Sequence, residues 1–293
     1  MISPRSTALL AIGVVSCAHA PPGAATNHPP AASTRAEPSP SAAARAVEAP
    51  PAGTGRGPAA TVEPLHLVAQ PLRLPGADGP ASLDFIFYER ARSRVWVPAG
   101  STGSVDVLDT ASGAFTRIEG FATAEREGHG RKRIVGPSAG SVGDGFAYIG
   151  NRATSEVCPV DLTTLTAGKC IKMSSGTDGV VYVAPSKEVW VTLPKEQTVA
   201  VLDASKPGAL KQKAAIKVDG SPECYAVDEG HGIFFTNLED KGGTVAIDIQ
   251  TRAARATWNA SCGADGPRGV AFDKGHDFVI VACTDHVQVL DAA

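Results

Sequence analysis

Short runs in which apolar and polar residues alternate recur along the chain from residue 105 onward, and several of them end in aspartate. This period-two alternation predicts short β-strands. The aspartates that close five of these runs are spaced 52, 42, 45 and 43 residues apart. A repeat of about 40–50 residues with several strands in each unit is typical of a β-propeller. The five runs are Val105–Asp109, Val157–Asp161, Val199–Asp203, Thr244–Asp248 and Val287–Asp291.

Each repeat is predicted to form one four-stranded antiparallel blade. The fourth repeat shows this best, with expected strands at 224–227, 232–236, 244–248 and 254–258. Between the third and fourth strands, Asp109–Gly113 in the first repeat has the composition of a tight turn. Helical periodicity of any length is absent from this part of the chain. The sequence therefore predicts an all-β fold, a β-propeller with five visible repeats.

The last repeat stops after its third strand, and we expect its fourth strand to come from elsewhere. Pro64–Leu74 is a strand-like segment that precedes the first blade. Pairing it with Val287–Asp291 would close the ring and hide two sheet edges. The sequence leaves two alternatives open: a five-bladed propeller with N-terminal strand closure, or an incomplete seven-bladed ring.

Three stretches carry a resemblance to a known family. Gly220–Asp228, Asn237–Lys241 and Gly266–Asp273 are similar to the repeats of YncE-like, or YVTN-type, bacterial β-propellers. The resemblance covers roughly residues 80–293. It implies a propeller, usually of seven blades, and a binding or scaffold role more often than a defined enzyme activity.

The N-terminal region predicts export rather than part of the fold. Residues 1–16 combine Arg5 with the apolar run Ala8–Val15, as a signal peptide does. Val14–Cys17 resembles the lipobox of bacterial lipoproteins, which implies lipidation of Cys17; the alternative is ordinary cleavage after Ala20. Residues 17–62, rich in Ala and Pro, are expected to be a disordered tether, followed by the propeller domain at 63–293.

These features predict a lipid-anchored protein on the periplasmic face of the outer membrane or on the cell surface, with the soluble periplasm as the alternative. The anchor is the only expected membrane contact, and the chain is expected to be a monomer. A net charge of −3 and 5% aromatic residues argue against nucleic-acid binding. The partner is expected to be another envelope protein or a small ligand.

Five polar residues fall at equivalent places, just before or at the start of the first strand of each repeat. They are spaced 45, 49, 45 and 45 residues apart, so in a propeller they would meet around the mouth of the central channel. They would either hydrate the channel or form a ligand site. The five are Asp84, His129, Asp178, Glu223 and Arg268.

No cofactor is predicted from the sequence, and a divalent cation is the one that these positions could take. Metal binding needs several oxygen or nitrogen ligands that converge at short range. The residues of suitable type are Asp84, Asp178, Glu223, Asn151 and Asn237, although Arg268 in the same ring argues against a highly charged ion. No haem, zinc-protease or nucleotide-binding motif occurs, and we predict no catalytic residue.

Four cysteines are placed to form two disulfides. Cys158 and Cys170 flank a turn symmetrically, and Cys262 and Cys283 fall near adjacent antiparallel strands. Reduced, buried thiols are the alternative for each pair. The second pair also resembles a cysteine pair that recurs in the family.

Together these observations predict an exported, membrane-anchored β-propeller that acts as a binding or scaffold protein of the cell envelope. The alternative is a metal-dependent, lactonase-like hydrolase that uses the channel mouth. The resemblance and the absence of a catalytic motif both favour the binding protein over the enzyme.

Overall fold

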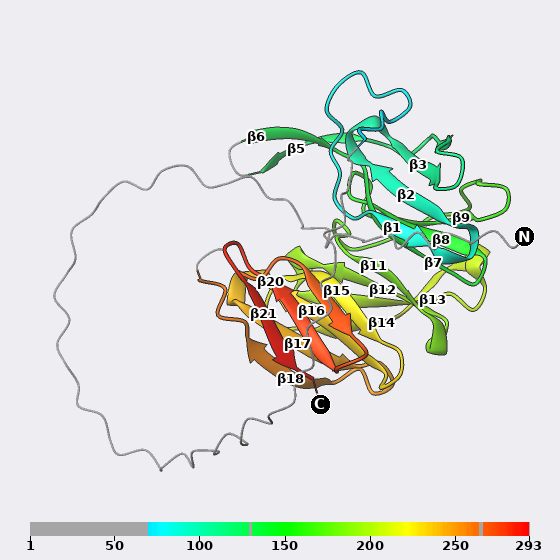
Figure 1. Cartoon of the computed structure of the whole chain (residues 1–293). Helices are drawn as coiled ribbons and strands as arrows, with labels where there is room; N and C mark the ends of the chain where they lie inside the picture. Colours follow the sequence, from blue (N-terminus) through cyan, green and yellow to red (C-terminus); the bar gives the residue numbers. More distant parts are fainter. Residues whose placement is uncertain (1–69, 129–130, 264–265, 293) are drawn as a thin grey trace, which may run out of the picture. The chain divides into compact units, whose positions relative to one another are not determined.

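The computed structural model describes residues 70–128, 131–263 and 266–292, and its strands form five blade-like sheets and one hairpin. Residues 73–292 belong to one compact unit (Figure 1). The first blade consists of β1 (Phe87–Glu89), β2 (Arg94–Ala99), β3 (Ser104–Asp109) and β4 (Phe115–Ile118), and the second of β7 (Pro137–Gly143), β8 (Phe146–Asn151), β9 (Glu156–Asp161) and β10 (Ile171–Lys172). The third blade consists of β11 (Val180–Val183), β12 (Glu188–Leu193), β13 (Thr198–Asp203) and β14 (Lys211–Lys217), and the fourth of β15 (Pro222–Asp228), β16 (Ile233–Leu238), β17 (Gly243–Asp248) and β18 (Ala254–Asn259). The fifth blade consists of β19 (Val270–Asp273), β20 (Phe278–Ala282) and β21 (Val287–Asp291). The hairpin is β5 (Ala124–Gly128) with β6 (Arg131–Val135), and the 3-10 turns are η1 (Arg90–Arg92), η2 (Gly100–Thr102), η3 (Ala184–Ser186), η4 (Pro194–Glu196), η5 (Pro207–Ala209) and η6 (Glu239–Lys241).

Every ladder is antiparallel and joins strands that follow each other in the sequence, as the repeats predict. Four sheets have four strands and the fifth has three. The five predicted runs ending in aspartate are the third strands β3, β9, β13, β17 and β21, and four of them begin one residue earlier than expected. The predicted all-β propeller architecture is confirmed.

The hydrophobic core lies between neighbouring blades. Trp190 of β12 packs against Phe234 of β16 with ring centroids 5.0 Å apart, and both side chains are fully buried. Burying apolar surface stabilises the fold by roughly 25 cal/mol for each Å², and large aromatic side chains contribute most of that area. The alternating strands thus place one apolar face toward each neighbouring blade.

The innermost strands also meet across the middle of the unit. Phe85, which precedes β1, stacks on Tyr225 of β15 with ring centroids 6.0 Å apart. The backbone N–H of Phe85 donates to the carbonyl of Ser138 in β7, 2.9 Å away. The first blade therefore contacts both the second and the fourth blade at its inner edge.

A buried carboxylate ties the third and fourth blades together. Glu188 is 2% exposed and accepts hydrogen bonds from Trp190 Nε1 at 3.1 Å and Lys213 Nζ at 2.6 Å. Arg252, from the turn after β17, donates to the same carboxylate at 2.7 Å. Burial alone would raise the pKa of Glu188, but these three donors together lower it. The carboxylate is thus satisfied, as buried charges must be.

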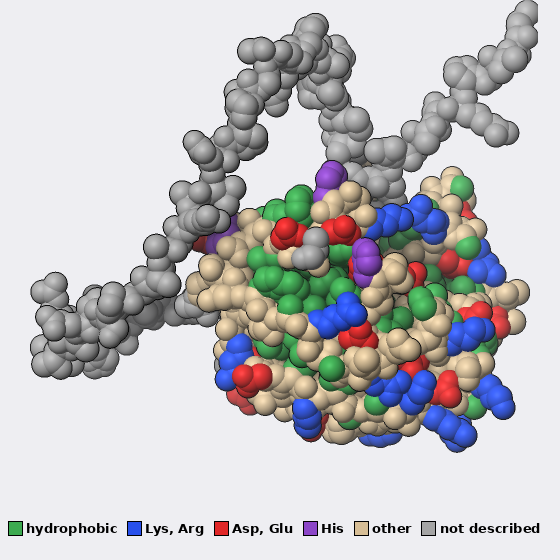
Figure 2. Space-filling model, turned by 90° about the horizontal axis from the view of Figure 1, so that it is seen from below, with side chains coloured by type: hydrophobic (Ala, Val, Ile, Leu, Met, Phe, Trp, Pro, Cys, Tyr) green, Lys and Arg blue, Asp and Glu red, His purple; other side chains and the backbone are tan. Residues whose placement is uncertain are grey.

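The β5–β6 hairpin lies between the first and second blades and was not expected from the repeats. Its strands carry mostly charged residues, and Lys132 Nζ lies 2.9 Å from Glu125 Oε1 across the ribbon. The predicted site residue His129 lies between its two strands in the sequence and outside the described residues. Acidic and basic side chains are interspersed on the face shown in Figure 2, so that face carries no field of one sign.

The fifth blade lacks a fourth strand among the described residues. The predicted closing segment is wrong for residues 70–74, which form no strand, while residues 64–69 lie outside the described part. Pro71 and Pro75 lack the N–H that a ladder needs. Gly76, at φ +62°, turns the chain, and the Ala77 N–H donates to the Leu74 carbonyl at 3.3 Å. In the described ladders, β21 pairs with β20 alone.

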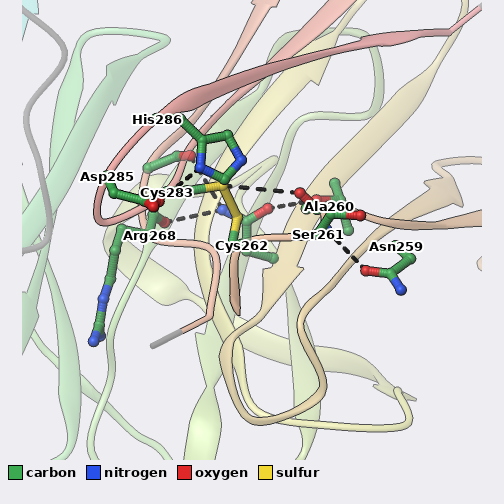
Figure 3. The surroundings of a disulfide bond; sticks show 11 residues. Asn259, Ala260, Ser261, Cys262, Arg268, Cys283, Asp285 and His286 are labelled. Atoms are coloured by element: carbon green, nitrogen blue, oxygen red, sulfur yellow. Dashed lines mark hydrogen bonds and ion pairs between the residues drawn. A yellow bond between two sulfur atoms is a disulfide. The ribbon is translucent and has the colours of Figure 1, made fainter. Parts of the chain in front are cut away.

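Both predicted disulfides are present. Cys158 in β9 bonds to Cys170 just before β10, and Cys262 bonds to Cys283 after β20. The second bond links the segment after the fourth blade to the turn between β20 and β21 (Figure 3). Disulfides persist in oxidising compartments, so the two bonds indicate an exported location. No helix in the described part of the chain is long and apolar enough to cross a membrane.

Removing either disulfide is expected to destabilise the protein. The bonded cysteines are 12 and 21 residues apart, and loops of this length predict a loss of about 2–4 kcal/mol in unfolding free energy. Chemical denaturation of Cys158→Ser/Cys170→Ser and Cys262→Ser/Cys283→Ser variants measures it. Peptide mapping without reductant provides the control that each remaining bond has formed. A denaturation midpoint equal to that of the wild type would contradict the prediction for that bond.

Candidate functional site

Arg152 is the centre of a charged cluster built from the inner ends of successive blades. It follows β8 directly, and its Nη1 lies 2.6 Å from Asp84 Oδ2, ahead of the first blade. Its Nη2 contacts Asp178 Oδ1, ahead of the third blade, and its Nε donates to the Thr177 carbonyl at 3.1 Å. One guanidinium therefore joins three blades, using the planar fork that suits arginine for this role.

The fourth blade joins the same cluster at the start of β15, where Cys224 contacts Asp178 and Glu223 lies beside it. The second oxygen of Asp178 accepts from the backbone N–H of Cys224 at 3.5 Å. Cys224 has a positive φ of 51°, and the β15–β16 register shifts there, so β15 bulges beside Glu223. Thr236 Oγ1 holds the bulge by donating to the Cys224 carbonyl at 2.8 Å. Bulges commonly aim a side chain at a functional site. We call Asp84, Arg152, Asp178 and Glu223 the axial cluster.

Glu223 differs from the other members of the axial cluster because its charge is not satisfied. Among the described residues its half-buried carboxylate makes no hydrogen bond and no ion pair, whereas Asp178 and Asp84 both contact Arg152. Burial raises the pKa of Glu223; Arg152 counteracts this and Asp84 adds to it. Like Arg152, Arg268 and Arg133 act to lower this raised pKa, so both lie within electrostatic reach of Glu223.

Arg268 stands beside the cluster with a partner of its own. Its Nη1 contacts Glu239 Oε1 of η6, and its backbone N–H donates to the Ala282 carbonyl at 2.8 Å. Figure 3 shows its side chain extending away from the Cys262–Cys283 disulfide. The fifth blade thus contributes a neutralised arginine rather than a free cation.

The structure therefore brings together most of the residues that the repeat spacing selected. Asp84, Asp178 and Glu223 surround Arg152, Arg268 lies nearby, and His129 is outside the described residues. Sequence reasoning missed Arg152, which lies at the end of a second strand rather than the start of a first one. Whether these residues bind a ligand stays a prediction.

The two asparagines proposed as metal ligands already use their side-chain amides in hydrogen bonds within the protein. Asn151 Nδ2 donates to the Ala122 carbonyl at 3.0 Å, and its Oδ1 accepts from the Ala153 N–H at 2.9 Å. Asn237 Nδ2 donates to the Arg268 carbonyl at 2.9 Å, and its Oδ1 accepts from Thr244 Oγ1 at 2.7 Å. Within the described residues, no group of three His, Cys, Asp or Glu side chains is placed to hold a metal ion.

Comparison with known proteins supports the architecture alone. No protein-family model matches the chain, and no curated protein matches it. Among solved structures, the Kuenenia stuttgartiensis hydrazine synthase aligns with a TM-score of 0.57 and 16% identity, over 71% of this chain and 58% of that one. A virginiamycin B lyase from Staphylococcus aureus aligns with a TM-score of 0.55 and 10% identity, over 75% and 72%.

The fold is a β-propeller. At these identities the likeness carries the fold and nothing about activity. This chain spans little more than half of the hydrazine synthase chain that it matches. The functional argument therefore rests on the axial cluster itself.

Glu223→Gln is expected to stabilise the protein at neutral pH. A raised pKa means that the folded state favours the protonated carboxyl, so the ionised form costs stability above that pKa. The amide keeps the shape without the charge, and we expect a gain of about 1 kcal/mol, or about 2–4 °C in melting temperature. The gain should shrink as the pH falls through the raised pKa and vanish below the ordinary value of 4.5.

Melting curves between pH 4 and pH 8 measure this gain. Glu196→Gln, on η4, is the matched control because it removes a carboxylate from a turn between strands and should leave the melting temperature unchanged. A Glu223→Gln variant that is less stable than the wild type at pH 7 would show that the carboxylate has a structural partner.

Proposed function

We propose that the protein is an exported binding module of the cell envelope and that the axial cluster is its ligand site. The observation that carries this proposal is Glu223, a half-buried carboxylate without a hydrogen bond or ion pair among the described residues. Such a group lowers the stability of the fold, because a partly buried charge without a partner loses hydration and gains no compensating contact. A strained backbone at Cys224 holds it in place, and strain of this kind is concentrated at functional sites.

The arrangement of charges suits binding better than catalysis. Asp84 and Asp178 are already committed to Arg152, so neither is free to act as a base or a nucleophile. A fixed guanidinium between two carboxylates gives a rigid frame, and Glu223 beside it is the group left to contact a ligand. Rigid frames of this kind reduce the entropic cost of binding.

A thermal-shift screen of the full-length protein tests the site. The probes are single small molecules of known charge, namely monocarboxylates, primary amines, amino acids, sugars and divalent cations. We expect at least one probe to raise the melting temperature of the wild type and of Glu196→Gln but not that of Glu223→Gln. If every stabilising probe acts equally on Glu223→Gln, or if no probe acts, the axial cluster is not the ligand site.

The hydrolase alternative makes a distinct prediction in the same screen. A metal-dependent enzyme would need a divalent cation bound at the cluster, where Arg152 already neutralises two of the carboxylates. Stabilisation by Mg²⁺, Ca²⁺ or Mn²⁺ that is lost in both Glu223→Gln and Asp84→Asn would favour that alternative. Stabilisation by an organic probe alone favours the binding module.

The lipid anchor is a separate part of the proposal. The two disulfides support an oxidising, exported location, and the lipobox-like Val14–Cys17 supports acylation of Cys17. We expect Cys17→Ala to move the protein from the membrane pellet to the soluble periplasmic fraction. Ser16→Ala, beside the modified residue, is the control and should remain in the pellet. An unchanged membrane fraction for Cys17→Ala would contradict lipidation.

A further inference from the structure

The β5–β6 hairpin directs an arginine toward the axial cluster. Arg126 and Arg133 are directly paired across the hairpin, so their side chains share one face of the ribbon. On that face Arg126 Nη2 donates to the Ala153 carbonyl at 3.1 Å, and Ala153 is the residue after Arg152. Arg133 therefore lies on the side of the hairpin that faces the loop carrying Arg152.

Of the three arginines that act on Glu223, two already have carboxylate partners. Four charged residues act on Glu223: Arg152 contacts Asp84 and Asp178, and Arg268 contacts Glu239. Arg133 is the fourth contributor that remains, and among the described residues it makes no ion pair and no side-chain hydrogen bond. Glu223 and Arg133 are thus two opposite charges at one site, each without a partner of its own in the described part of the chain.

A ligand with one positive and one negative group complements this pair. An ammonium offers three donors, and an arginine binds a carboxylate through two parallel hydrogen bonds. A simple anion would leave Glu223 without a partner and would approach Asp84 and Asp178. A simple cation would satisfy Glu223 and leave Arg133 in solvent. A ligand that carries both groups can pair each of them.

We propose that the axial cluster binds a small zwitterion, an amino carboxylate, with its ammonium on Glu223 and its carboxylate on Arg133. This inference rests on the proposed function and adds the chemical class of its ligand. The hairpin, which interrupts the regular repeat between the first and second blades, then has a role in recognition. Lys132 on the same hairpin contacts Glu125 and takes no part in the site.

Isothermal titration of the full-length protein tests the ligand class. The probes are L-alanine, β-alanine and γ-aminobutyrate, which differ in the separation of their charges, with N-acetyl-L-alanine and L-alaninamide as analogues lacking one charge. We expect one amino carboxylate to bind at least tenfold more tightly than both analogues. In Glu223→Gln the preference over the N-acetyl analogue should disappear, and in Arg133→Gln the preference over the amide should disappear.

Lys132→Gln and Glu196→Gln are the matched controls and should keep both preferences. Melting curves of each variant establish that it is folded. Equal affinity of the zwitterion and both analogues, or preferences that persist in Glu223→Gln and Arg133→Gln, would overturn the inference. If a ligand of another class binds in a Glu223-dependent manner while no amino carboxylate does, this inference fails and the proposed function stands. If no probe binds through Glu223, both fail.

Discussion

Replacing Arg152 with methionine is expected to lower the free energy of unfolding by about 3–5 kcal/mol, because it leaves buried carboxylates without their counter-charge. Asp178 has a side chain that is 4% exposed, and Asp84 has one that is 15% exposed, so water cannot fully replace the guanidinium. Methionine keeps much of the aliphatic bulk, so the loss comes mainly from the charge and the hydrogen bonds. Chemical denaturation at pH 7 measures it.

Two further variants distinguish the effect of breaking the ion pairs of Arg152 from the effect of removing any arginine side chain. Arg126→Met removes an exposed arginine with one hydrogen bond to the Ala153 carbonyl, and it should cost less than about 1 kcal/mol. Adding Asp178→Asn to Arg152→Met should restore part of the stability, since the uncompensated charge is removed. A loss equal to that of Arg126→Met would show that the two carboxylates do not depend on Arg152.

The repeat spacing predicted the first-strand positions well because blades repeat their hydrogen-bond pattern. A residue at the start of β11 and one at the start of β15 necessarily face the same axis, whatever their side chains. This is why Asp178 and Glu223 could be placed from spacing alone. Their contacts could not be predicted, because the residue after the second strand differs between blades. Arg152 follows Asn151 in the second blade, whereas the buried Leu238 follows Asn237 in the fourth.

The β5–β6 hairpin could not be predicted because its pattern does not depend on burial. Its strands hardly alternate apolar and polar residues, and its backbone ladder is flanked by exposed charged pairs such as Glu125 with Lys132. Hydrophobic alternation identifies strands that bury one face. A ribbon exposed on both sides leaves no such signal. The disulfides were predictable because the turns and strands around each pair already fix which cysteines can meet.

Among the described residues, the outer edge of the fifth blade exposes two valines. Val287 and Val289 of β21 are 61% and 58% exposed. In the third strand of the third blade, Val199 and Val201 are fully buried. The other third strands pair on both sides, whereas β21 pairs with β20 alone in the described ladders. An exposed apolar edge strand promotes aggregation unless something covers it.

Deleting residues 63–69 is expected to lower the melting temperature by about 5 °C or more and to produce oligomers. The alternating Leu65, Leu67 and Ala69 would place one apolar face against β21 if this segment supplies the missing strand. Its loss would expose Val287 and Val289 to other molecules, and a shift of this size corresponds to roughly 2 kcal/mol or more in a domain of this length. Thermal melting and light scattering of the purified protein measure both effects.

Deleting seven residues from the Ala- and Pro-rich region, 40–46, is the matched control, because it shortens the same N-terminal region without removing the leucines. It should leave the protein monomeric with an unchanged melting temperature. A Val287→Thr/Val289→Thr variant adds a second test: in the 63–69 deletion it should suppress the oligomers, since it makes the uncovered edge polar. If the 63–69 deletion stays monomeric and melts with the wild type, that segment does not pair with β21.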